Sequence, residues 1–301
     1  MLRFGMTAAL LLAALGAEAA GFGASGVGAT AGGFLSLGAG ARAIGMGGAY
    51  SAAADEASAL YWNPGAMTMV PRRSATFMHA AYVASSYYDY ASYVQNAGPY
   101  GAFGLGLQYF SAGSVDQTDE NFSPLGSVTP YDLAASAGYA YKFERGFSLG
   151  ASAKFIQSKL TQTANTAALD LGLLWPGLID DRLRLAFTAQ NLGGTLKYDQ
   201  AKESLPMAFK AGAAFRITPN WLAALDAAAP RNDSPYLNLG TEYLLAAGDW
   251  WRFAGRAGFS TQDLRPAVGI GIGGGAMSVD YAFVPYNYLG DVHRVSLTFS
   301  F

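Results

Sequence analysis

The chain has 301 residues, a formal net charge of −2 and no cysteine; 51% of its residues are hydrophobic and only 13% are charged. The charged fraction is about half that of soluble domains, so the composition favours a membrane protein, and the charge gives no reason to expect a nucleic-acid partner. A chain without cysteine forms no disulfides and has neither thiolate metal ligands nor cysteine nucleophiles.

The first 19 residues have the pattern of a secretory signal peptide. Arg3 provides a positive charge, residues 7–15 form a short apolar run, and Ala17-Glu18-Ala19 matches the small-x-small cleavage pattern. The alternative, a membrane anchor helix, would need an apolar run of about 18 residues or more. We therefore expect cleavage after Ala19.

Residues 20–72 are rich in Gly, Ala and Ser and show little two-residue alternation. One or two short helices are predicted between Arg42 and Leu60. They should end before Asn63-Pro64-Gly65, because a proline disfavours helical backbone at the preceding residue. The glycine-rich run 45–49 lacks both the preceding strand and the residue spacing of a phosphate-binding loop. We interpret its glycines as sites of close packing.

From Arg73 onward, apolar and polar residues alternate, which is typical of strands with two different faces. In the last segment, the apolar residues at 295, 297, 299 and 301 alternate with Arg294 and the polar residues at 296, 298 and 300. About fourteen such strands are predicted: 73–83, 86–96, 100–111, 131–143, 147–159, 166–175, 182–192, 205–217, 220–229, 236–245, 250–260, 265–274, 275–285 and 291–301.

These strands predict an all-β transmembrane barrel rather than a soluble sandwich. They are near the ~9–11 residues of a tilted membrane strand, and many have aromatic residues near their ends. After residue 20, no apolar run is long enough for a transmembrane helix, and only helices and closed barrels satisfy their backbone polar groups in lipid. Side chains alone fill a barrel of about eight strands at most, so residues 20–72 are expected to plug the lumen.

We expect no catalytic centre, metal site or cofactor. Asp291 and His293 would share one strand face, but no serine lies in a recognisable nucleophile setting. The acidic residues at 116, 119 and 120 lack the spacing of a calcium loop, which favours a solvated acidic loop. The prediction is therefore that the chain is not an enzyme.

The runs 34–49, 54–59 and 62–64 resemble the N-terminal signature of the PorV/PorQ family, a branch of the FadL-like outer-membrane proteins. The runs 280–286 and 289–297 resemble the ending of the same family. The resemblance implies a fourteen-stranded barrel (73–301) with a hatch (20–72) inside its lumen. Asn63-Pro64-Gly65 then corresponds to an Asn-Pro-Ala element, with Gly65 in place of the usual alanine.

Site residues follow from this resemblance. The hatch residues expected to gate a ligand are Gly45, Gly47, Gly48, Asn63, Pro64 and Gly65. A terminal aromatic strand resembles the recognition signal of outer-membrane barrels, so Phe299 and Phe301 are expected to direct assembly.

Two functions remain open at the level of sequence. One is passive transport of hydrophobic small molecules through a plugged barrel in the bacterial outer membrane. The other is an accessory or shuttle role in a type IX-like secretion system, in which the protein binds exported proteins. The expected partners are outer-membrane lipid, the barrel assembly machinery, and either a hydrophobic small molecule or a secretion translocon. The mostly polar loop 111–130 is a mild argument against an apolar extracellular funnel.

Overall fold

A computed structural model describes residues 31–301 apart from 83–84, 120, 122, 199–200, 249 and 287–289. The expected signal peptide lies outside these residues. None of the helices in the described part of the chain is long and apolar enough to cross a membrane.

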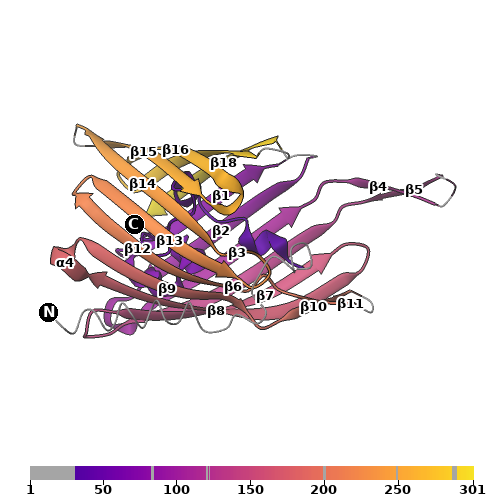
Figure 1. The fold of residues 1–301 in the computed structure, drawn as a ribbon, viewed down its shortest axis with the longest axis horizontal. Coiled ribbons are helices and arrows are strands. Elements are labelled where there is room, and N and C mark those ends of the chain that lie inside the picture. Colours follow the sequence, from indigo (N-terminus) through magenta and orange to yellow (C-terminus); the bar gives the residue numbers. More distant parts are fainter. Residues whose placement is uncertain are drawn as a thin grey trace.

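The described strands form a closed barrel of fourteen antiparallel strands (Figure 1). The barrel closes between the first and last strands, where Ser74 pairs with Ser300 and Ala81 with His293. Its strands are β1 (Arg73–Ala81), β2 (Tyr87–Asn96), β3 (Ala102–Ser111), β6 (Tyr131–Lys142), β7 (Ser148–Lys159), β8 (Thr163–Gly177), β9 (Leu183–Leu192), β12 (Ala208–Thr218), β13 (Trp221–Pro230), β14 (Tyr236–Ala247), β15 (Trp251–Ser260), β16 (Arg265–Gly274), β17 (Met277–Tyr286) and β18 (Gly290–Ser300). The predicted barrel and strand number are confirmed.

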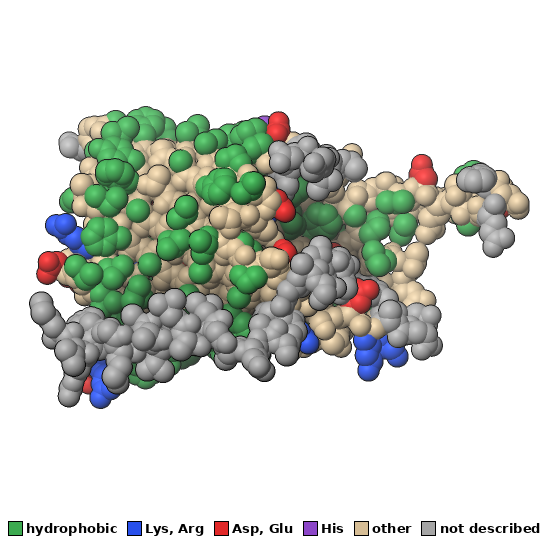
Figure 2. All heavy atoms as spheres, in the orientation of Figure 1, with side chains coloured by type: hydrophobic (Ala, Val, Ile, Leu, Met, Phe, Trp, Pro, Cys, Tyr) green, Lys and Arg blue, Asp and Glu red, His purple; other side chains and the backbone are tan. Residues whose placement is uncertain are grey.

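The wall has an apolar outer face and an inner face of small and polar residues. On β18, Arg294 and Ser296 are buried inside the barrel, whereas Val295 between them is 49% exposed on the outside. Hydrophobic side chains cover much of the visible outer wall, and charged ones gather toward its ends (Figure 2). This alternation follows from the two-residue period of a strand, and an outward apolar band is what a lipid-spanning barrel requires.

The two ends of the barrel differ. One end carries two additional hairpins, β4 (Val115–Thr118) with β5 (Pro124–Val128) and β10 (Thr195–Tyr198) with β11 (Ala201–Ser204). They extend beyond the barrel (Figure 1), and the sequence analysis had not predicted them as strands. We call this the hairpin end; the short helix η5 (Gln262–Leu264) also lies there.

The opposite end, which we call the short-turn end, has tight connections such as η4 (Gly98–Tyr100) and α4 (Leu178–Asp181). Arg73 and Phe301 also lie at this end, joined by backbone hydrogen bonds of 3.1 and 3.0 Å. Bacterial outer-membrane barrels have short periplasmic turns and longer extracellular loops.

The hatch lies inside the lumen, and almost all of its described residues are buried. Its described part, residues 31–72, contains four short helices: η2 (Gly33–Ser36), α2 (Ala41–Gly45), α3 (Ala59–Trp62) and η3 (Pro64–Met69). The predicted helical segment therefore forms two short α-helices. The second ends where Asn63 adopts extended backbone (φ −160°, ψ 102°), as expected of a residue before proline.

Candidate functional site: a hatch between two cavities

The predicted glycine run of the hatch packs directly against glycines and backbone of the wall. A Cβ atom on Gly45 would lie 3.0 Å from the Cα atom of Gly269 on β16. Gly47 has a φ of +66°, and a Cβ atom there would lie 2.6 Å from the backbone nitrogen of Phe259 on β15. Since a side chain at these positions would displace backbone, the glycines allow the hatch to contact the wall closely.

Asn63-Pro64-Gly65 forms a second attachment, on the β7–β8 side of the barrel. The Asn63 amide nitrogen donates to the Ser51 carbonyl within the hatch (3.0 Å) and to the Leu173 carbonyl of the wall (3.1 Å). A Cβ atom on Gly65 would lie 2.8 Å from the Gly172 carbonyl oxygen. This contact explains why glycine replaces the alanine that the family resemblance leads one to expect.

Charged residues join the short-turn side of the hatch to the wall. Arg42 of α2 donates two hydrogen bonds of 2.8 Å to Glu242 of β14 and one of 2.6 Å to Asp55 of the hatch. Glu242 also accepts from Arg256 of β15 at 2.7 Å, and Arg256 donates to Asp280 of β17 at 2.7 Å. We call these five residues the hatch ion network. No local pattern in the sequence predicts this network.

Glu56 lies beside this network, 3.6 Å from the Arg42 guanidinium. Burial raises the pKa of Glu56 to about 7, although the charge of Arg42 and a hydrogen bond from Ser58 partly oppose the shift. The carboxyl group therefore changes charge near neutral pH while the hatch is docked.

Further polar contacts hold the hatch elsewhere. Asp226 of β13 accepts hydrogen bonds from the Ser51 hydroxyl (2.8 Å) and backbone nitrogen (3.0 Å). Gln190 of β9 donates to the Tyr61 carbonyl at 2.7 Å, and Ser296 of β18 accepts from the Ala41 nitrogen at 2.6 Å. Contacts to strands on several sides of the barrel fix the hatch across the lumen.

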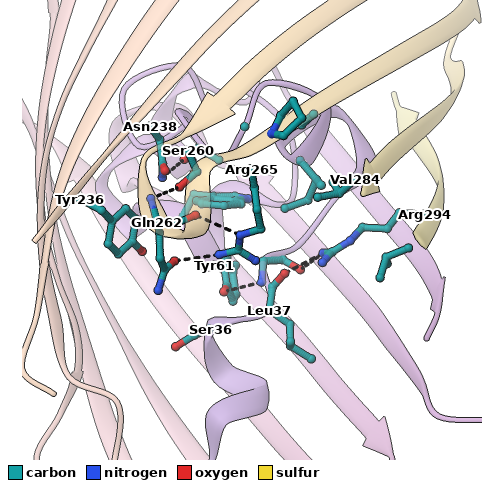
Figure 3. Close-up of a pocket in the computed structure, with 18 of the residues that line it drawn as sticks. Ser36, Leu37, Tyr61, Tyr236, Asn238, Ser260, Gln262, Arg265, Val284 and Arg294 are labelled. Carbon is teal, nitrogen blue, oxygen red and sulfur yellow. Dashed lines mark hydrogen bonds between the residues drawn. The ribbon is translucent and has the colours of Figure 1, made fainter. Parts of the chain in front are cut away.

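A cavity lies on each side of the hatch. The hairpin-end cavity, of about 400 Å³, is lined by hatch residues such as Leu37, Tyr61 and Trp62 together with wall residues such as Phe110 (Figure 3). The short-turn cavity, of about 450 Å³, is lined by Arg42 and other members of the ion network. The two share no residue of the part of the chain that the structure describes, so the hatch separates them.

Of the predicted gating residues, Gly47 and Gly48 line the hairpin-end cavity. Gly45, Asn63, Pro64 and Gly65 lie instead at contacts between hatch and wall. The structure thus divides the predicted set between cavity lining and attachment. A role of these residues in gating stays a prediction.

The remaining candidates lie outside the lumen. His293 is on the outer face, where its Nδ1 atom is 2.7 Å from the Tyr281 hydroxyl, and His79 is paired with Asp89 at 2.6 Å. Phe301, at the short-turn end, is 54% exposed. No group of three His, Asp or Glu residues in the described ranges could hold a metal ion.

Comparison with known proteins supports both the fold and the family resemblance. The family described as "Type IX secretion system protein PorV" matches residues 22–170. No curated protein matches.

Solved structures with the same fold include the toluene transporter TodX of P. putida (TM-score 0.60, 14% identity, 88% of this chain and 99% of that one). The CymD monoaromatic hydrocarbon channel has a TM-score of 0.60 at 13% identity, covering 88% of this chain and 98% of that one. A Pseudomonas aeruginosa FadL homologue has a TM-score of 0.55 at 11% identity, covering 86% and 97%.

Proposed function

We propose that this chain, whose residues 22–170 match the PorV family and whose barrel has the fold of FadL-like channels, carries small molecules with an apolar body passively across the bacterial outer membrane. The three structural relatives are named as transporters or channels of toluene or other monoaromatic hydrocarbons, or as a FadL homologue. These names suggest a channel rather than an enzyme.

The observation that carries the proposal is the position of the hatch between two separate cavities. A barrel with a purely structural role does not require a cavity of about 400 Å³, lined by aromatic side chains, on the hairpin-end side of its hatch. Ligand sites in proteins are typically concave, mostly apolar and furnished with a few polar groups. The hairpin-end cavity fits this description, since Trp62, Phe110 and Val284 line it together with Asn238 and Gln262.

In the proposed mechanism, a ligand enters from the hairpin end and binds in the hairpin-end cavity, against the hatch. It cannot reach the short-turn cavity while the hatch is docked, because Gly45 and Gly47 lie against the backbone of β15 and β16. Passage therefore requires at least part of the hatch to leave the wall. The contacts that must break first are polar ones, such as those of Arg42 with Glu242 and of Ser51 with Asp226.

Uptake by cells tests transport. In a panel of neutral and anionic aromatic compounds, at least one class should accumulate faster in cells that carry the gene than in cells that lack it. Equal uptake of every compound would contradict a channel function.

A cross-link tests whether the hatch must move. The native chain has no cysteine, and the side chains of Ser51 and Asp226 lie 2.8 Å apart. In the double variant Ser51→Cys/Asp226→Cys, oxidation should abolish uptake and a reductant should restore it. The single variant Asp226→Cys is the matched control and should not respond to oxidation. If the oxidised double variant transports as fast as the reduced one, the ligand does not pass through the hatch.

The second candidate is the secretion role, which the PorV match over residues 22–170 favours. In this role the barrel would bind exported proteins, and the hairpins β4–β5 and β10–β11 would be the parts that extend toward them. Deleting the gene should then remove exported proteins from the cell surface. An unchanged set of surface proteins would contradict this role.

A further inference from the structure

The hairpin-end cavity has an unbalanced charge. Three cationic side chains line it: Lys210 of β12, Arg265 of β16 and Arg294 of β18. No aspartate or glutamate from the described part of the chain belongs to its lining. A neutral aromatic ring gains only a weak cation–π attraction from a nearby cation, whereas an anion would interact favourably with the full charge of each of the three.

Arg294 is buried in this lining, and no acidic residue in the described part of the chain is paired with it. Only 1% of the residue is exposed. Its guanidinium donates to the Leu37 carbonyl (2.7 Å) and the Tyr82 hydroxyl (2.7 Å), and its Nε atom is buried without a hydrogen-bond partner. A buried charge held by neutral groups alone is costly, because burial removes its hydration without supplying an opposite charge.

Lys210 is in a similar position. It is 8% exposed, and its ammonium group lies 5.0 Å from the centre of the Trp62 ring. Among the described residues, no hydrogen bond or ion pair of this ammonium is found. The acidic group that acts on it most strongly, Asp226, already accepts hydrogen bonds from the hatch at Ser51.

Arg265 completes the cationic group from the opposite side of the cavity. It donates to the backbone and side-chain oxygens of Gln262 and forms an ion pair of 3.7 Å with Asp263, whose side chain is largely exposed. Figure 3 shows Arg265 and Arg294 approaching the hatch around Leu37 and Tyr61 from different strands. Their positive charges converge over the same surface of the hatch.

Much of the remaining lining is apolar, and the volume of the cavity suits a small ligand. Its apolar members are Ile44, Trp62, Phe110, Val284 and Val292, among others. Cavities that hold small ligands measure roughly 300–1,000 Å³, so about 400 Å³ suits one ring with a substituent.

We propose that the hairpin-end cavity binds compact organic anions, with a carboxylate among Lys210, Arg265 and Arg294 and a ring against the apolar side chains around Trp62. This inference rests on the proposed transport function and names the class of substrate. It separates this chain from the relatives named for toluene and monoaromatic hydrocarbons.

Binding to the purified full-length protein in detergent tests the inference, with benzoate as the anionic probe and benzyl alcohol as its neutral counterpart of similar shape. Titration calorimetry should give a dissociation constant for benzoate at least tenfold lower than that for benzyl alcohol. The benzoate constant should rise at least tenfold in Lys210→Met. Lys202 of β11 is an exposed cation at the same end, and Lys202→Met is the control that should bind as the parent does. Equal binding of the two probes, or no effect of Lys210→Met, would overturn the inference.

Arg294→Met is a second variant, but it also removes contacts to the hatch, so its heat-modifiability must first match that of the parent. Uptake then separates the two proposals. If cells take up neutral aromatics through the protein but benzoate neither binds nor enters, the anion inference fails and the transport proposal stands. If benzoate binds tightly but neither class enters, the binding inference stands and the transport proposal fails. If benzoate neither binds nor enters and neutral aromatics do not enter, both fail.

Discussion

Gly47 offers the most direct test of how the hatch is held in the lumen. It combines a left-handed backbone (φ +66°) with a close approach to backbone atoms of the wall: a Cβ atom there would lie 2.6 Å from the Phe259 nitrogen and 2.9 Å from the Leu239 carbonyl oxygen. Its neighbour Gly48 has a similar φ of +79°. A Cβ atom on Gly48 would meet the Asn238 side-chain nitrogen at 3.2 Å, and a side chain can move aside.

The expected cost of Gly47→Ala has two parts. An alanine in left-handed backbone costs roughly 1–2 kcal/mol, and Gly48→Ala carries this part as well. Overpacking against a wall that cannot shift adds about 1–3 kcal/mol, and only Gly47→Ala carries it. The undocked fraction of the hatch should therefore be about 5- to 150-fold higher in Gly47→Ala than in Gly48→Ala.

A cysteine reporter measures the undocked fraction. Ala53, in the hatch, is completely buried, and the chain has no other cysteine to react. In the Ala53→Cys background, the rate of maleimide labelling should increase from the parent to Gly48→Ala and again to Gly47→Ala. Equal rates for the two alanine variants would refute the reasoning, because they would show that the close approach to β14 and β15 does not hold the hatch.

Three further predictions use the same reporter or the same barrel. Arg42→Met should increase the rate of labelling strongly, because removing one partner of a buried ion pair typically costs about 3–5 kcal/mol. Arg252 lines the same cavity, and the control variant Arg252→Met should have little effect. Equal labelling rates in the two variants would contradict a role of Arg42 in holding the hatch. The raised pKa of Glu56, about 7 against an ordinary 4.5, means that the docked state binds a proton more tightly than the undocked state. The contribution of Glu56 to the free energy of docking is therefore fully present below about pH 4.5 and falls by up to about 3 kcal/mol as the pH rises through 7. The labelling rate of the parent reporter, divided by that of its Glu56→Gln variant, should rise over this range. A constant ratio would contradict the prediction. Deleting Phe301 should lower the fraction of the protein in the membrane that is heat-modifiable and thus folded as a barrel. An unchanged fraction would contradict a role of Phe301 in assembly.

The barrel could be predicted from the sequence because its signal is local. Each strand repeats an alternation of two faces, and the last predicted strand, 291–301, differs from the observed β18 by one residue at each end. The sequence pattern does not predict the four strands of the extra hairpins, because each has only four or five residues: β4, β5, β10 and β11. Such short strands carry too few alternations to stand out, and they pair only with each other beyond the wall.

The hatch was predictable in outline for a different reason. A lumen too wide for side chains to fill requires a plug, and only residues 20–72 lacked a strand pattern. Where each glycine of this segment would lie was not predictable. The contact of Gly45 with Gly269, or of Gly65 with Gly172, depends on the path of the hatch across the lumen, which no local pattern encodes.

The ion network and the cationic cavity could not be assembled from sequence because their members are far apart in the chain. Arg42 and Glu242 are 200 positions apart, and Arg256 reaches Glu242 because the β14–β15 register places them opposite one another. One feature of the sequence does indicate charged partners inside the lumen. Glu242, Arg256 and Arg294 are charged residues on inward strand faces where small and neutral polar residues predominate, and such residues need partners inside the lumen.

The hatch is attached differently on its two sides, and the proposed transport depends on both attachments. On the short-turn side, Arg42 is paired with Glu242 of the wall as well as with Asp55 of the hatch, so undocking breaks its pair with Glu242. On the hairpin-end side, Arg294 donates to the carbonyl oxygens of Leu37 and Gly38 and has no acidic partner among the residues that the structure describes. A carboxylate that binds Arg294 competes with these carbonyls for the same guanidinium, so ligand binding weakens one attachment of the hatch. Since a ligand shifts an equilibrium only by its differential affinity for the two states, a bound anion should promote undocking to the extent that it displaces Leu37 and Gly38.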